Sequence, residues 1–381
     1  MSPIPIDLST ALLGGLTPQV FMRRHWQKKP LLVRQAVPTP RSFVGRAELF
    51  ALAARDDVES RLVVRRAGHW TLRHGPLPRR ALPPLAQRDW SLLVQGLDLH
   101  LGGARSLLER FRFVPDARLD DVMVSYASDG GGVGPHVDSY DVFLLQIHGV
   151  RRWRIGRVER PQLQAGVPLK ILTNFVAQDE WRLEPGDMLY LPPGWAHDGV
   201  AEGECMTASI GFRAAGRDEL ARELLQRVLD VDSAGPAQLY RDPRQRASEQ
   251  PARIPDALRQ FGADALRRWL AQHGDIGCAL GEVLSEPKPG VWFERCVASV
   301  DAASVRLDRR SRMLYDDRHV FINGESFRAA GRDATLMRQL ADMRRLDARA
   351  VQRLGEAARD LLAQWHEAGW LHVVDEEGGP R

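Results

Sequence analysis

The stretch "GGVGPHVDSYDVFLLQIHGVRRWRIG", residues 131–156, places two polar side chains at the start of a long apolar run. His136 and Asp138 stand two positions apart, directly before that run. Side chains at positions i and i+2 of a β-strand point to the same face, so this pair is expected to converge on one spot. An imidazole and a carboxylate that point to one spot are typical of a metal site.

A third metal ligand is expected from a distant strand of the same barrel. The stretch "PGDMLYLPPGWAHDGV", residues 185–200, has a tight turn before an apolar strand and a second turn that presents His197 at the strand's exit. Two histidines and one carboxylate form the facial triad of non-heme Fe(II) oxygenases, which leaves coordination positions open. Each of these residues alone is more often surface polarity or a satisfied hydrogen bond. Together, after the glycine-rich "DGGGVGP" and at the spacing of a double-stranded β-helix, they predict an iron site.

An oxygenase of this type also needs a two-electron donor. A 2-oxo dicarboxylate would chelate the metal through its oxo-acid end and would need a cation deeper in the barrel for its other carboxylate. The stretch "HGVRRWRIG" offers Arg151, with Arg152 and Arg154 as competitors. Strand alternation places Arg151 and Trp153 on one face and the two competitors on the other, so only one set points inward. We expect Arg151 to bind the far carboxylate of the co-substrate with two hydrogen bonds. The alternative is that all three arginines face solvent on an edge strand.

Composition limits the class of protein. A chain of 381 residues exceeds one typical domain, so two or three folded units are expected. The apolar fraction of 44% and the charged fraction of 27% are ordinary for a soluble globular protein. The formal net charge of +4 is compatible with an anionic or nucleic-acid-bearing partner, and equally with an arginine-rich soluble enzyme.

Cysteine and histidine positions outside the predicted triad show no further motif. Cys205, Cys278 and Cys296 form no close pair, which argues against a disulfide framework, a zinc knuckle or an iron–sulfur site. The N-terminus has no basic leader with an apolar core, and no run of 18 apolar residues occurs, so a reducing cytoplasm is the expected location. The remaining histidines are expected to be ordinary: His25, His69, His74, His100, His148, His273, His319, His366 and His372.

Three regions of the chain differ in their pattern of apolar and polar residues and so in predicted secondary structure. Residues 1–213 are rich in β-like runs, with a hairpin predicted at 60–75 and a strand at 121–128. Residues 214–284 are helical, with helices predicted at 217–230 and 255–273 around a polar stretch at 233–253. Residues 285–381 resemble a winged helix in their order, with a hairpin predicted at 319–327, helices at 334–346 and 348–370, and a strand at 371–374.

These motifs together resemble one known family. The stretches "FMRRHWQKKPLLVRQA", "DDVMVSYASDGGGVGPHVDSYDVFLLQIHGVRRWRIG" and "EPGDMLYLPPGWAHDGV" with "MTASIGFRA" are similar to the bacterial JmjC-type ribosomal oxygenases. The resemblance spans essentially the whole chain. It implies an α+β protein with a double-stranded β-helix (cupin, JmjC) catalytic domain over 1–213, a helical dimerisation region over 214–284 and a winged-helix domain over 285–381.

The resemblance also implies an activity and its cofactors. Members of the family use Fe(II), 2-oxoglutarate and O₂ to hydroxylate an arginine of a large-subunit ribosomal protein. A cytoplasmic homodimer whose partner is that ribosomal protein is therefore expected, with no membrane and no nucleic acid bound.

The family's functional positions are carried over where this sequence matches. The iron triad and the 2-oxoglutarate-binding arginine fall on the residues already singled out. Ser125 and Thr207 look like residues that assist at the same carboxylate, although the family often has an amide where Thr207 stands. Asp121 and Tyr140 look like the pair that holds the substrate arginine, because a guanidinium in a partly desolvated site needs a carboxylate and a hydroxyl as acceptors. Asp121 as a strand-start cap or surface charge is the alternative.

Two other functions are compatible with parts of the sequence. A winged helix commonly binds DNA, so the chain could be a cupin-fused regulator. The predicted helix at 348–370 argues against this because acidic residues offset its arginines. A cupin that acts on a small molecule is the second alternative, and the inward arginine and the long additional domains disfavour it.

Overall fold

The computed structural model of the protein describes residues 4–38, 43–229, 239–241, 254–273, 275–296 and 303–374. It divides into two compact units. Unit 1 consists of Met1–Ala214, Lys288–Ser311 and Asp342–Arg381, and unit 2 of Ala215–Pro287 and Arg312–Ala341. The three-part division expected at residues 213 and 284 is a division by sequence and remains a prediction. Within the described ranges, no helix is both long enough and apolar enough to cross a membrane.

A ten-stranded sheet forms the main part of unit 1. Its path is β1-β9-β7-β10-β5-β4-β2-β3, with β6 paired to β10 and β8 paired to β7. Neighbouring strands are antiparallel. The strands are β1 Leu31–Val33, β2 Ser60–Arg66, β3 His69–His74, β4 Trp90–Val94, β5 Leu119–Ala127, β6 His136–Val137, β7 Asp141–Arg157, β8 Asp179–Leu183, β9 Met188–Leu191 and β10 Trp195–Phe212.

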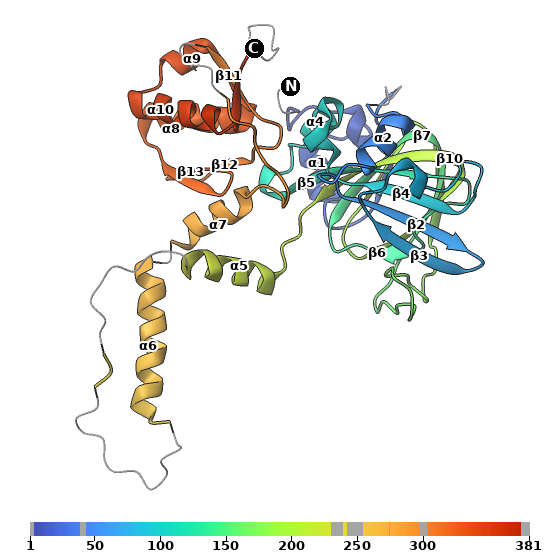
Figure 1. Ribbon diagram of the computed structural model, residues 1–381, viewed down its shortest axis with the longest axis horizontal. Helices are drawn as coiled ribbons and strands as arrows, with labels where there is room; N and C mark the ends of the chain where they lie inside the picture. Colours follow the sequence, from blue (N-terminus) through green and yellow to red (C-terminus); the bar gives the residue numbers. More distant parts are fainter. Residues whose placement is uncertain are drawn as a thin grey trace. The chain divides into compact units, whose positions relative to one another are not determined.

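Short helices cover one face of this sheet. The helical segments are η1 Ala11–Leu13, α1 Pro18–Arg24, α2 Arg46–Ala53, η2 Arg79–Ala81, α3 Leu97–His100, α4 Gly102–Glu109 and η3 Asp116–Arg118. Figure 1 shows α1, α2 and α4 beside the strands. Phe21, Leu49 and Leu107 from these three helices belong to the same buried cluster as Val122 and Ile210 from the sheet. Burial of this apolar face is the main force that holds the helices on the sheet.

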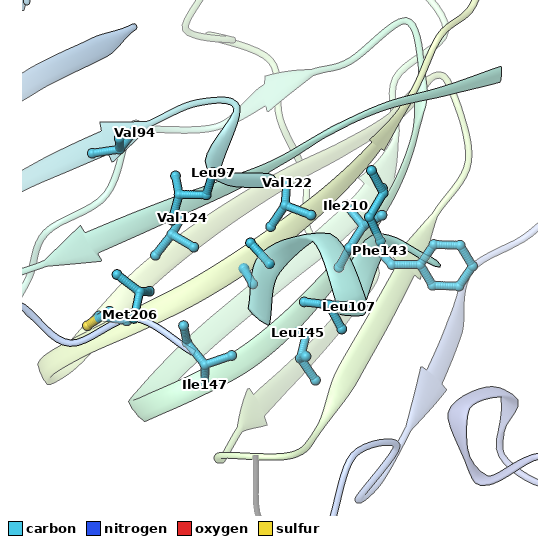
Figure 2. Packing of buried hydrophobic residues seen from close by; sticks show 14 of the residues in the cluster. Val94, Leu97, Leu107, Val122, Val124, Phe143, Leu145, Ile147, Met206 and Ile210 are labelled. Atoms are coloured by element: carbon cyan, nitrogen blue, oxygen red, sulfur yellow. The ribbon is translucent and has the colours of Figure 1, made fainter. Parts of the chain in front are cut away.

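Alternation along the strands separates this core from a cavity on the opposite side. On β5, Val122 and Val124 face the helices and belong to the core shown in Figure 2. The intervening Met123 and Ser125 line a cavity instead. The same period of two places Ile210 in the core and Ser209 in the cavity on β10. The sheet therefore offers one apolar face for folding and one more polar face for chemistry.

The predicted turn at Pro185–Asp187 is held by a buried carboxylate. Asp187 accepts backbone N–H groups from Gln35 at 3.0 Å and Glu184 at 3.1 Å, and the Arg34 guanidinium at 2.6 Å. Burial raises the pKa of this carboxyl, but the two backbone N–H groups and Arg34 outweigh it and hold the pKa below the ordinary 3.8. The side chain thus joins the turn before β9 to the end of β1.

Asp187→Asn is expected to destabilise the protein by about 1–3 kcal/mol at neutral pH. An amide has only one acceptor oxygen and no charge, so it cannot accept all the hydrogen bonds that the buried carboxylate accepts. A carboxyl with a lowered folded-state pKa stabilises the fold above its unfolded pKa and loses this effect as the pH falls through the folded value. The free-energy difference between wild type and variant should therefore shrink below about pH 4. Urea unfolding across pH measures it. Asp179→Asn, at an exposed position of β8, is the control and should change stability little. If the free-energy difference between wild type and Asp187→Asn did not change with pH, the stabilising role of the ionised Asp187 carboxylate would be contradicted.

The rest of unit 1 and unit 2 contain the C-terminal elements. Unit 1 includes β11 Ser304–Leu307, β15 Arg345–Leu346, α9 Ala348–Gln352, α10 Glu356–Glu367 and β16 Leu371–Val374, with the strand order β15-β11-β16. Unit 2 includes α5 Arg217–Leu229, α6 Asp256–His273, α7 Ile276–Ser285, β12 Met313–Tyr315, β13 His319–Ile322 and β14 Glu325–Arg328. Helix α8, Gly331–Met343, has all but its last two residues in unit 2.

Most predicted elements are found, and one is wrong. The hairpins at 60–75 and 319–327, the strands at 121–128 and 371–374, and the helices at 217–230, 255–273 and 334–346 correspond to observed elements. The single helix predicted over 348–370 is two helices, because the chain breaks after Gln352 and α10 begins only after Gly355. Of the polar stretch at 233–253, only 239–241 lies within the described residues.

Candidate active site

His136, Asp138 and His197 lie together at one end of the β6–β10 pair. His136 and His197 are directly opposed in the antiparallel register, and Asp138 follows β6. The Asp138 Oδ2 atom lies 3.6 Å from His197 Nε2 and 3.9 Å from His136 Nε2. One ligand atom from each residue can be chosen so that all three lie within 4.8 Å of one another. This arrangement can hold one metal ion on one side and leave the other side open.

The two imidazoles are oriented by backbone carbonyls. His136 Nδ1 lies 2.9 Å from the Gly134 oxygen, and His197 Nδ1 lies 3.1 Å from the Trp195 oxygen. A carbonyl only accepts, so Nδ1 donates in each ring and the Nε2 lone pair faces the carboxylate. Burial and the neighbouring His136 lower the pKa of His197 to about 4, which keeps this ring neutral at physiological pH. Neutral imidazole is the form that binds metals.

Arg151 is a buried guanidinium that points into the same cavity. It is 3% exposed, and its terminal nitrogens donate to Ser125 Oγ at 3.0 Å and to the Gly199 carbonyl at 3.2 Å. Its Nε has no partner among the described residues, and none of the ion pairs formed there includes it. Burial lowers the pKa of this guanidinium from its ordinary 12.5, which reflects the cost of a desolvated charge. Such a site is prepared for an anion, and a planar guanidinium suits a carboxylate.

Of the three candidate arginines on β7, it is the predicted Arg151 that faces the cavity. Arg151 and Trp153 are buried on the cavity face of β7. Arg152 pairs with Glu180 and Glu202 on the outer face. Arg154 also points outward and pairs with Asp198. The alternative of three solvent-facing arginines is therefore wrong for Arg151.

Two residues of this site had no predicted role: Trp153, which was only placed on the same face as Arg151, and Gly199, which was not singled out. The Arg151 guanidinium carbon lies 4.9 Å from the centre of the Trp153 ring, and that ring lies 5.8 Å from the His197 ring. Gly199 is paired with Trp153 across β7 and β10, and a Cβ there would lie 2.6 Å from the indole and 2.8 Å from Arg151 Nε. Only a residue without a side chain fits between them. The glycine in "AHDGV" was visible in the sequence, but its neighbour across the sheet was not.

Gly199→Ala is expected to push Trp153 and Arg151 out of position and to destabilise the protein by about 1–3 kcal/mol, as overpacking does. Among the described residues, the hydrogen bonds of Arg151 go to Ser125 and Gly199 and not to the predicted metal ligands, so the KM for the expected 2-oxoglutarate co-substrate should rise more than kcat falls. Steady-state kinetics with chemical unfolding measures both. Gly102→Ala is the control, since a Cβ there meets nothing within 4 Å. An unchanged KM in Gly199→Ala would show that the close packing of Gly199 against Trp153 and Arg151 does not position the arginine.

Ser125 and Thr207 lie beside Arg151, as opposed residues of β5 and β10. Ser125 Oγ donates to the Thr207 carbonyl at 3.5 Å while it accepts from Arg151. Thr207 Oγ1 donates to the Gln146 side-chain oxygen at 2.8 Å. Gln146 was not singled out in the sequence, and its side-chain N–H groups also donate to the His148 and Gly149 carbonyls at 2.8 Å and 3.2 Å. Gln146 lies opposite Thr207 in the register of β7 and β10, and it holds the Thr207 hydroxyl in place.

The predicted substrate pair, Asp121 and Tyr140, lines the same cavity. Asp121 is mostly buried and already has partners, since Oδ2 accepts from the Gly96 N–H at 3.1 Å and lies 3.0 Å from Lys288 Nζ. Lys288 Nζ also lies 2.9 Å from Asp120 Oδ1. Burial, with the Asp138 and Asp121 carboxylates, raises the pKa of Tyr140, so the phenol stays protonated. This part of the cavity, called its mouth, therefore combines the acidic acceptor Asp121 and the Tyr140 hydroxyl with the cation Lys288.

All eight predicted site residues line one cavity of about 490 Å³. The roles given to them remain predictions, while their proximity is a property of the fold. An antiparallel barrel-like sheet that carries two histidines, one carboxylate and a buried arginine on its inner face belongs to the class of cupin-type metal-dependent oxygenases.

Comparison with known proteins gives the family within this class. Residues 106–220 match the model of the JmjC domain, and residues 279–372 match the model of the ROXA-like winged helix. The chain is 39% identical over 237 residues to the ribosomal protein uL16 3-hydroxylase of Escherichia coli K12, over 61% of this chain and 62% of that protein. It is 29% identical to a probable ribosomal oxygenase of Haemophilus influenzae, over 94% of this chain and 96% of that protein.

A solved structure agrees over nearly the full length. The structure of YcfD, a ribosomal oxygenase from Escherichia coli in complex with cobalt and 2-oxoglutarate, is 30% identical, covers 93% of this chain and 98% of that chain, and gives a TM-score of 0.78. The chain belongs to the JmjC-type ribosomal oxygenase family. The predicted family and fold class are confirmed, and the predicted metal and 2-oxoglutarate agree with the ligands of that relative.

Proposed function

We propose that this protein is an Fe(II)- and 2-oxoglutarate-dependent oxygenase that hydroxylates an arginine side chain of a large-subunit ribosomal protein. The observation that carries the proposal is the pairing of a metal-binding triad with a buried guanidinium that has no carboxylate partner among the described residues. The relatives named for action on uL16 and for ribosomal oxygenase activity support the substrate class.

The residues of the cavity fit the proposed cofactors. Iron with 2-oxoglutarate, when bound, supplies the oxidising power that uses O₂ to insert an oxygen atom into a C–H bond. His136, Asp138 and His197 would hold the metal, and Arg151 with Ser125 would fix the far carboxylate of the co-substrate. Thr207 would support the same end of the cavity. The protein itself mainly places the reacting carbon, so no acid–base pair is proposed.

An arginine suits the mouth of the cavity. A guanidinium that enters it finds the Asp121 carboxylate and the neutral Tyr140 hydroxyl as acceptors for its planar donors. Lys288 already forms an ion pair with Asp121 Oδ2, so a substrate arginine would have to share that carboxylate with Lys288 or displace the lysine. The proposal therefore predicts that Asp121→Asn and Tyr140→Phe weaken substrate binding more than 2-oxoglutarate binding.

The experiment is incubation of the purified enzyme with Fe(II), 2-oxoglutarate and isolated large-subunit ribosomal proteins, uL16 among them, followed by peptide mass spectrometry. The expected result is the mass of one added oxygen on an arginine, with succinate formed in equal amount. Peptides in which lysine replaces that arginine are the control and should remain unmodified. Oxygen found on a histidine would overturn the arginine assignment while keeping the oxygenase. Succinate formation that no ribosomal protein stimulates would favour a small-molecule substrate.

We also propose that residues 214–284 support a cytoplasmic homodimer. Leu225 and Leu229 on α5, and Leu258 and Leu266 on α6, are 40% to 66% exposed. Exposed leucines on helices that follow one another in the chain are typical of an association surface. Light scattering measures the mass in solution, and a monomer at micromolar concentration would contradict the proposal.

A further inference from the structure

A second group of metal-ligand side chains lies in the C-terminal part of unit 1, in Cys296, His366 and His372. One ligand atom from each can be chosen so that all three lie within 4.8 Å of one another. His372 Nδ1 is 3.7 Å from Cys296 Sγ, although 76 residues separate the two in the chain. The expectation that His366 and His372 are ordinary missed this group, because α10 and β16 bring the two histidines to the cysteine only in the folded chain.

The hydrogen bonds of the two imidazoles leave one nitrogen of each for the cluster. His372 Nε2 lies 2.8 Å from Asp308 Oδ2 and donates to it, which leaves the Nδ1 lone pair toward the cysteine. His366 Nδ1 donates to the Leu371 carbonyl at 3.0 Å, which leaves its Nε2 as the acceptor. His366 is only 4% exposed, and its Nε2 has no hydrogen-bond partner among the described residues. A buried unpartnered nitrogen is costly unless something binds it.

The Asp308 carboxylate behind His372 is held from its other side by Arg310. Arg310 donates to Asp308 Oδ1 through Nε at 2.8 Å and to Oδ2 through its terminal nitrogen at 3.2 Å. A carboxylate that fixes the tautomer of a histidine is the usual support of a metal-binding imidazole.

The backbone holds Cys296 in place. Its N–H donates to the Glu367 carbonyl at 3.1 Å, at the end of α10. Gly369, in the turn between α10 and β16, has a φ of +76°, and a Cβ there would lie 2.1 Å from the Glu294 carbonyl. The segment that carries the cysteine therefore lies directly against the turn that separates His366 from His372.

We propose that Cys296 Sγ, His366 Nε2 and His372 Nδ1 together bind one Zn²⁺ ion. With bond lengths of about 2.3 Å to sulfur and 2.0–2.1 Å to nitrogen, tetrahedral ligands lie about 3.3–3.6 Å apart, so the cluster needs to close only slightly. The thiol proton leaves to solvent as the thiolate binds. Water fills the fourth position. A thiolate with two imidazoles favours zinc, whereas the oxygen-containing triad of the active site suits iron. The ion would tie the segment at residue 296 to α10 and β16.

Co²⁺ is the probe, because a cobalt–thiolate bond gives an intense near-ultraviolet charge-transfer band that histidine and carboxylate ligands do not give. The metal-free full-length protein is titrated with Co²⁺ and then with Zn²⁺. Wild type is expected to bind two metal ions per chain and to show the band, which Zn²⁺ should abolish. Cys296→Ser should bind one ion and show no band. His136→Ala should also bind one ion but keep the band, so that failure of this site and failure of the active site are distinguishable.

Two further variants sharpen the result. Asp308→Asn removes only the support behind His372 and should weaken the second ion about 10- to 100-fold, with the band retained at saturation. Cys278→Ser removes a half-buried cysteine of unit 2 and should change neither the stoichiometry nor the band. His372→Gln, at a partly exposed position, replaces Cys296→Ser if that variant unfolds. A wild-type protein without the band, or a band that survives in Cys296→Ser, overturns the proposal.

Discussion

The His136→Ala protein is expected to lose at least about 100-fold in 2-oxoglutarate turnover, because removal of a mere supporting neighbour of a metal ligand already costs about 10- to 100-fold. His136 supplies one of three ligand atoms, and its imidazole is fixed by the Gly134 carbonyl. Two remaining ligands hold a divalent ion too weakly to keep it at assay concentrations. Activity should therefore fall together with metal affinity, whereas the folded structure should persist.

Succinate formation and calorimetric titration with Mn²⁺ measure these two effects. The titration is best made in the Cys296→Ser background, so that only the triad contributes. His148→Ala is the matched control, since His148 is an exposed histidine of β7, 3.8 Å from Glu204, and belongs to none of the ligand groups found among the described residues. It should retain wild-type turnover and affinity. Turnover that persists in His136→Ala would remove the triad from the mechanism.

The parts of the site that could be predicted are those set by local geometry. His136 and Asp138 stand two positions apart, which in a strand is enough to place them on one face. The same rule separated Arg151 from Arg152, because a period of two places them on opposite faces, but it did not say which face is inward. His197 was reachable through its position after a turn at the end of an apolar strand.

The remaining features depend on contacts that no local pattern encodes. Gly199 matters because β10 brings it against the Trp153 ring, and that register is a property of the folded sheet. Gln146 joins the site for the same reason, through the hydroxyl of Thr207. The break after Gln352 was missed because the apolar spacing continues on both sides of it, and helical propensity alone does not reveal where packing ends a helix.

The Arg151→Met protein is expected to keep its fold but to bind 2-oxoglutarate far more weakly. Methionine retains apolar contact with Trp153 but removes the donors that Arg151 directs into the cavity. Loss of one partner of a buried charged pair costs about 2–5 kcal/mol, which corresponds to a rise in KM of about 30-fold to several thousand-fold. The effect should appear in KM for 2-oxoglutarate first, since the metal ligands and the substrate mouth are untouched.

The variants Arg151→Lys and Arg152→Met separate the guanidinium from simple charge. Lysine keeps one positive charge but offers no planar fork, so its KM should lie between those of wild type and Arg151→Met. Arg152→Met loses an outer-face arginine paired with Glu180 and Glu202, and its KM should equal that of wild type. Because Arg151 is buried without a carboxylate of its own, removing it in the absence of co-substrate should also leave stability equal or higher. A KM for Arg151→Met within about threefold of wild type, which is less than 1 kcal/mol, would show that the co-substrate carboxylate binds elsewhere.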